Sequence, residues 1–263
     1  MKKLFSVAFL ALASMGTVPA HADPSNDAAQ ANNPLAAFNT FNLQNQYNGK
    51  LTGTNDTANS FYLRGAVPVS AFGGEWLVRA TLPINRVPDP VGGGNASGVG
   101  DFNVFAAYLI ETGNPNLSFG IGPQLTAPTA SKDAVGSGKW SAGIANVLFN
   151  FANPKFQWGY LLTWQASFAG DSARANVNQA AFQPILIGQL GKGWYLRSTA
   201  IWVYDVKSND YNIPIGFGVG KVTKTRKAIV NAFIEPQYSV ASRGSGQAEW
   251  GVFAGVNFQF PKK

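Results

Sequence analysis

Apolar and polar residues alternate with a period of two along several stretches of the chain. In the stretch 155–170, KFQWGYLLTWQASFAG, aromatic and aliphatic residues fall mainly on one face, and the other face carries Gln, Gly, Thr and Ser. The same two-faced pattern recurs in EWGVFAGVNFQF at 249–260 and around 76–84. A period of two indicates β-strands whose faces meet different surroundings. A soluble sandwich would carry charged residues on its exposed face, so these strands fit a sheet with lipid on one side and water on the other.

About twelve stretches of this kind are predicted as strands. They lie near residues 40–51, 60–70, 74–84, 99–111, 117–127, 139–151, 155–169, 179–190, 193–205, 211–221, 228–240 and 248–260. The connections alternate in length, as in the short AFG after residue 70 and the long NRVPDPVGGGNAS after residue 84. Bacterial outer-membrane barrels have an even number of strands, short periplasmic turns and longer outer loops. The sequence therefore predicts an all-β fold, a closed antiparallel transmembrane β-barrel; a soluble sandwich or lipocalin-like barrel is the alternative.

The N-terminal residues predict export. The chain starts with a charged MKK, continues with an apolar stretch, and reads AHA at 20–22, the small-x-small form of a cleavage site. We expect a cleavable signal peptide at 1–22, a flexible segment at 23–39, and one barrel domain at 40–263 in the cell outer membrane. A buried N-terminal helix or membrane anchor is the alternative, and the polar DPSNDAAQANN that follows disfavours it.

Composition excludes several kinds of function. Charged residues make up 13% of the chain, about half the usual share of a soluble domain. Cysteine is absent, and the one histidine, His21, lies in the predicted signal peptide. A mature chain without Cys or His cannot use Ser–His or Cys–His catalysis and lacks the usual zinc ligands. We therefore expect no enzymatic activity, no cofactor and no metal site.

The basic residues are spread along the chain. The formal net charge of +7 falls to +5 once Lys2 and Lys3 are removed with the signal peptide. The longest basic cluster, KVTKTRK at 221–227, contains no aromatic residue that could stack on a base. No nucleic acid partner is predicted.

Two glycine-rich motifs resemble phosphate-binding loops only superficially. GVGD at 98–101 is followed by FNVFAAYLI, which alternates like a strand, whereas a phosphate loop leads into a helix. GFGVGK at 216–221 has Ile215 where a P-loop needs glycine. We expect both motifs to belong to the barrel wall, with the second leaving it smooth or close-packed.

The stretches SGVGDFNVFAAYLI, LSFGIGPQLTAPTA and GSGKWSAGI, between residues 97 and 144, carry a family resemblance. With the aromatic-rich strands that follow, the chain from about residue 61 onward resembles the MetA-pathway of phenol degradation family of bacterial outer-membrane transporters. The resemblance implies passage of small solutes, aromatic or hydrophobic compounds among them, across the outer membrane. The implied partners are outer-membrane lipid, a small-molecule solute and the outer-membrane assembly machinery, and no ligand residue is implied.

Polar residues on the predicted inner faces are candidates for lining a pore. They are Arg64, Glu75, Arg79, Asp101, Asn103, Gln157, Gln165, Arg197, Glu235 and Gln237, with Gln124, Gln183, Gln189, Asp205 and Asn257 on the same faces. One interpretation is that these residues pair across a narrow barrel and stabilise it. The other is that the three arginines form a charged constriction, set against Glu235 and Asp101, that filters solutes. A structural barrel with a plugged lumen and a soluble exported barrel that binds a small ligand remain alternative functions.

Tryptophans on the opposite faces are predicted to lie at the membrane interface. They are Trp76, Trp158, Trp164, Trp194, Trp202 and Trp250. Aromatic girdles at both membrane surfaces are typical of outer-membrane barrels, which makes this interpretation stronger than a ligand-binding aromatic box.

Overall fold

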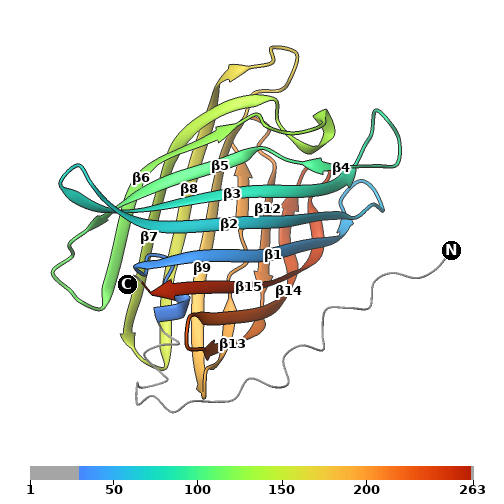
Figure 1. The fold of residues 1–263 in the computed structure, drawn as a ribbon. Helices are drawn as coiled ribbons and strands as arrows, with labels where there is room; N and C mark the ends of the chain where they lie inside the picture. Colours follow the sequence, from blue (N-terminus) through green and yellow to red (C-terminus); the bar gives the residue numbers. More distant parts are fainter. Residues whose placement is uncertain (1–29, 262–263) are drawn as a thin grey trace.

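The computed structural model describes residues 30–261, so the predicted signal peptide at 1–22 lies outside the described residues. The chain forms one antiparallel sheet that closes into a barrel where the first and last strands pair (Figure 1). The strands are β1 (Phe38–Leu51), β2 (Ala58–Ala71), β3 (Gly74–Pro88), β4 (Asn95–Val99), β5 (Phe102–Ile110), β6 (Leu117–Ala127), β7 (Lys139–Asn153), β8 (Phe156–Gly170), β9 (Asn178–Gly191), β10 (Trp194–Ser198), β11 (Trp202–Asp205), β12 (Tyr211–Gly216), β13 (Gly218–Lys224), β14 (Ile229–Arg243) and β15 (Ala248–Pro261).

Three barrel strands are each split into two shorter segments. β4 and β5 both pair with β3, β10 and β11 both pair with β9, and β12 and β13 both pair with β14. The barrel therefore has twelve strands, and the predicted fold class is confirmed. A short 3-10 helix, η1 (Asp133–Val135), lies in the connection between β6 and β7. Within residues 30–261, no helix is long and apolar enough to cross a membrane.

The two faces of the strands differ as the period of two predicts. In β8, Trp158, Leu162 and Trp164 point outward with 44%, 41% and 42% of their surface exposed. Gln157 and Leu161, on the opposite face of the same strand, are buried inside the barrel. Because the sheet is closed, it has no edge strand with unpaired backbone N–H and C=O groups. A closed sheet with an apolar outer face meets both requirements of a hydrocarbon environment.

The two ends of the barrel also differ. The short-turn end carries the tight connections at 72–73, 154–155 and 192–193, and the loop end carries the longer connections at 89–94, 128–138 and 171–177. The first residue of β1 pairs with the last residue of β15, so both termini of the barrel lie at the short-turn end. In outer-membrane barrels this is the periplasmic end.

The barrel interior is packed with apolar side chains toward the short-turn end, where the sequence pattern predicts a polar lining. Two clusters of buried residues fill it. They are Ala31, Phe149, Ile185, Ile187, Tyr195, Val222 and Ile229 in one, and Leu35, Ala66, Leu77, Phe105, Ala107, Ala145, Val147 and Leu161 in the other. A barrel of about twelve strands is narrow enough for large side chains from facing walls to meet.

Residues 30–37 lie inside this end of the barrel, although we expected 23–39 to be a flexible segment. Ala31 and Leu35 are each 4% exposed and belong to the two apolar clusters. The Ala31 carbonyl accepts a hydrogen bond from Gln259 Nε2 at 2.8 Å, and Asn33 Nδ2 donates to Ser118 Oγ at 3.0 Å. Contacts with β15 and β6 hold the segment across the lumen. We call residues 30–37 the plug segment.

Candidate functional site

The loop-end half of the barrel is hollow. Three cavities of about 400, 290 and 500 Å³ share parts of their walls, and we call them together the outer vestibule. Their shared walls include Tyr62, Arg64, Asp101, Gln165 and Ile201. A smaller cavity of about 160 Å³, the inner cavity, is bordered by residues of the plug segment.

Most of the predicted lumen residues border one of these spaces. Those at the outer vestibule are Arg64, Arg79, Asp101, Asn103, Gln124, Gln165, Gln183, Asp205 and Gln237. Arg197 and Asn257 border the inner cavity. Gln157 and Glu235 are 0% exposed and border neither, and Gln189 donates a hydrogen bond to Gln157 at 2.8 Å.

Glu75 differs from the other predicted lumen residues. It lies at the short turn between β2 and β3, is exposed, and accepts a hydrogen bond from Ser70 Oγ at 2.5 Å. Its position on the inward face of β3 follows the alternation, but it stands at the rim, where the strand leaves the barrel. It therefore takes no part in the vestibule.

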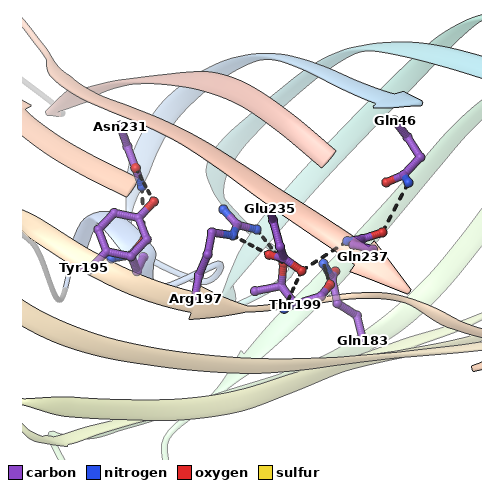
Figure 2. A network of polar contacts seen from close by, with 9 residues as sticks. Gln46, Gln183, Tyr195, Arg197, Thr199, Asn231, Glu235 and Gln237 are labelled. Carbon is purple, nitrogen blue, oxygen red and sulfur yellow. Dashed lines mark hydrogen bonds and ion pairs between the residues drawn. The ribbon is translucent and has the colours of Figure 1, made fainter. Parts of the chain in front are cut away.

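Glu235 is the centre of a buried polar cluster (Figure 2). Its carboxylate accepts hydrogen bonds from Arg197 Nε at 2.7 Å, from the Thr199 backbone N–H at 3.0 Å and from Thr199 Oγ1 at 2.8 Å. Gln237 Nε2 adds a fourth at 3.1 Å. The Arg197 guanidinium also lies 3.7 Å from the centre of the Phe233 ring. Both members of this ion pair are hydrogen-bonded and shielded from water, so their charges are compensated locally.

The glycines of GFGVGK make room for this cluster. A side chain at Gly216 would collide with the Glu235 carboxylate, and one at Gly218 with the backbone and Cβ of Glu235. A side chain at Gly220 would meet the Tyr195 ring, whose hydroxyl donates to Asn231 Oδ1 at 2.6 Å. The alternating glycines are needed because the Glu235 and Tyr195 side chains of the adjacent strands β14 and β10 lie across them.

Arg64 and Arg79 form the second group of charges. Arg64 Nη1 donates to Gln44 Oε1 at 2.6 Å, and Arg79 makes no hydrogen bond or ion pair with any described residue. The Nε atoms of both are buried without a partner. Each guanidinium covers an aromatic ring, Arg64 that of Tyr62 at 4.5 Å and Arg79 that of Phe105 at 4.3 Å. Both arginines border the outer vestibule and the inner cavity, so they stand at the boundary between the two.

Asp101 is hydrogen-bonded to the loop 128–138 at the loop end of the barrel. Its carboxylate accepts hydrogen bonds from the Ala130 N–H at 3.2 Å, the Ser137 N–H at 2.6 Å and Ser137 Oγ at 2.7 Å. Within residues 30–261, no arginine or lysine lies within ion-pair distance of it. The GVGD motif thus covers the end of β4 and the break at 100–101 before β5, and a side chain at Gly98 would collide with Ser131 of the loop 128–138. Asp101 fixes the loop 128–138 over the vestibule and does not neutralise the arginines.

The predicted interface tryptophans fall into two groups on the outer surface. Trp76, Trp158 and Trp194 lie within a few residues of the tight turns at the short-turn end, and Trp164, Trp202 and Trp250 lie toward the loop end. Trp140, 40% exposed and directly after the loop 128–138, shares the position of the second group and was not among the predicted residues. Its signal was present in the sequence, because it starts an alternating stretch after a glycine-rich loop.

Gln44 and Thr199 are two further residues of the lumen that sequence reasoning missed. Gln44 lies on the inward face of β1 in the alternating FNLQNQYN, so its position could have been read from the pattern. Thr199 lies in the break between β10 and β11, where the pattern is interrupted and gives no direction.

Comparisons with known proteins give the fold but no family. No protein-family model matches the chain, and no curated protein matches it. The resemblance to the MetA-pathway of phenol degradation family therefore stays a prediction.

Solved structures of outer-membrane barrels are similar to this chain. An outer membrane channel from Pseudomonas putida F1 superposes with a TM-score of 0.66 at 15% identity, over 87% of this chain and 97% of that one. The NanC porin superposes with a TM-score of 0.53 at 11% identity, over 84% of this chain and 100% of that one. At these identities the likeness establishes a shared barrel fold.

Proposed function

We propose that this chain is an outer-membrane channel through which small solutes, aromatic or hydrophobic compounds among them, pass without an energy source. The observation that carries the proposal is a polar vestibule enclosed by a closed barrel whose outside is apolar. The apolar outside favours a membrane protein over a soluble exported binding barrel. The two similar structures are a channel and a porin by name, which supports a transport role over an enzymatic one. The tryptophans at both ends are assigned to the two membrane surfaces.

The plug segment and the apolar clusters favour a second candidate, a structural barrel with a closed lumen. We reconcile the two by proposing that the structure is the closed state of the channel. The plug segment is held by a few hydrogen bonds and by Ala31 and Leu35, far fewer contacts than join the strands. Its displacement would connect the inner cavity to the short-turn end.

Removing the plug segment tests the proposal. We expect the mature chain lacking residues 23–36 to show at least a several-fold higher conductance in planar bilayers, and faster liposome swelling with small sugars and simple aromatics, than the mature chain. A chain lacking only residues 23–29 is the matched control, since it keeps the plug segment. Circular dichroism and the shift in gel mobility on heating would report whether each barrel is folded. If the folded truncated barrel conducts no better than the control, and neither admits solutes, the structural barrel is the correct function.

A further inference from the structure

The charges in the middle of the lumen do not balance. Arg197 is paired with Glu235 at 2.7 Å, whereas Arg64 and Arg79 have no carboxylate within ion-pair distance among the described residues. Asp101, the acidic residue that lines the same cavity as these two arginines, is bound to the loop 128–138 through three hydrogen bonds. The boundary between the outer vestibule and the inner cavity is therefore positively charged.

The two arginines also have unused hydrogen-bond donors. A guanidinium carries five N–H donors, and Arg64 uses one of them on Gln44 while Arg79 uses none on any described residue. A buried polar group without a partner is costly, so such donors in a hollow site indicate a position for water or a ligand. Arg64 and Arg79 are also close enough to repel each other, and an anion between them would remove that repulsion.

The residues around Arg64 and Arg79 determine which kind of anion can bind there. The rings of Tyr62 and Phe105 cover one flat face of each guanidinium, and both Nε atoms are buried, which leaves the edges formed by the Nη groups for the cavity. Those edges match the two oxygens of a carboxylate. Tyr62 and Leu161 add apolar surface to the cavity that both arginines border, so an anion with a small hydrophobic body fits better than a bare inorganic ion.

We propose that Arg64 and Arg79 form a binding site for the carboxylate of small organic anions, at the boundary between the outer vestibule and the inner cavity. This inference rests on the proposed channel function and specifies its solute class. Arg79 is the main ligand because neither of its Nη groups is used on a described residue, and Arg64 shares the anion while Gln44 holds its position. Neutral solutes of the same shape would keep at most a single neutral acceptor and would lack the ion pair.

Binding can be measured without any conductance, which separates this inference from the channel proposal. The probe is 4-fluorobenzoate, followed by 19F NMR line broadening with the full mature chain in detergent micelles, and 4-fluorobenzamide is its neutral counterpart. We expect 4-fluorobenzoate to bind at least tenfold more tightly than the amide, after subtraction of partition into empty micelles. Equal binding of the acid and the amide by the wild-type chain overturns the inference, whatever the conductance.

Substitutions then assign the site. We expect Arg79→Gln to weaken 4-fluorobenzoate binding at least tenfold and Arg64→Gln to weaken it less. Arg86→Gln is the matched control, because Arg86 lies on the same strand as Arg79 but is exposed near the loop end and borders no cavity of the vestibule. Unchanged binding in both Arg79→Gln and Arg64→Gln, with the barrel folded by heat-shifted gel mobility, overturns the assignment. Tight binding in a chain that never conducts would contradict the channel proposal and leave this one standing.

Discussion

Arg197 and Arg79 both point into the barrel interior, but only Arg197 meets a carboxylate. Arg197 and its partner Glu235 have side chains that are 9% and 0% exposed, and four donor groups converge on that carboxylate. Arg79 borders two cavities and has no polar partner among the described residues. The same residue type in one lumen thus occupies a saturated site and an open one.

The difference follows from what faces each arginine. Gly216 and Gly218 leave room beside Glu235 on the neighbouring strand β14, so the carboxylate packs closely between the strands and meets Arg197 there. Arg79 borders a cavity, and the acidic residue that lines the same cavity, Asp101, is hydrogen-bonded to the outer loop. Close packing converts a charged pair into part of the structure, whereas a cavity leaves the charge free to meet a solute.

The largest effect on stability is expected from a substitution at Glu235. We expect Glu235→Gln to lower the free energy of unfolding by about 3–5 kcal/mol, because it leaves the Arg197 charge buried without a counter-charge. Urea unfolding followed by tryptophan fluorescence in lipid vesicles would measure it. Glu75→Gln is the control, since this exposed glutamate at the short turn has no such role and a change below about 0.5 kcal/mol is expected. A stability change at Glu235 no larger than at Glu75 would mean that the two arginine sites do not differ in the way described.

The second largest effect on stability is expected at Gly216, which packs against the Arg197–Glu235 ion pair. We expect Gly216→Ala to lower the free energy of unfolding by about 1–3 kcal/mol, because the added methyl group collides with the Glu235 carboxylate in a closely packed wall. Gly65→Ala is a matched control in β2: its added methyl group would find only the Thr40 carbonyl, at 3.8 Å. The same urea titration distinguishes the two, and equal stability of both variants would contradict the packing explanation for GFGVGK.

The barrel itself could be predicted from the sequence because the alternation is local. Each strand meets lipid on one face, so residues such as Trp158 and Leu162 carry the signal regardless of which strands pair. The plug segment could not be predicted in this way. Its sequence, QANNPLAA at 30–37, shows no apolar–polar alternation, and its position depends on Ser118 and Gln259, which are far away in sequence.

For the candidate site, the sequence predicts which side chains point into the barrel but not which of them contact each other. Alternation points Arg64, Arg79, Asp101 and Glu235 inward, and the structure places all four inside the barrel. Which carboxylate meets which arginine depends on how the strands and loops are arranged around the barrel. Asp101 was expected to face an arginine and instead binds Ser137 in the loop 128–138, because the break between β4 and β5 turns it toward that loop. Apolar packing at the short-turn end was missed for the same reason, since alternation does not show how narrow the barrel is.

The smallest effect on stability, and the sharpest test of the comparison, is expected at Arg79. We expect Arg79→Ala to change the free energy of unfolding by less than about 1 kcal/mol, because no carboxylate loses its partner and the lost contact with the Phe105 ring is weak. In the chain lacking residues 23–36, the same substitution should shift the reversal potential in a KCl gradient toward cations, since a positive charge is removed from the boundary between the outer vestibule and the inner cavity. Arg86→Ala, on the same strand but exposed, should alter neither quantity. If Arg79→Ala instead destabilises the barrel as strongly as Glu235→Gln and leaves the selectivity unchanged, Arg79 serves the structure, and the contrast between an open and a saturated arginine site disappears.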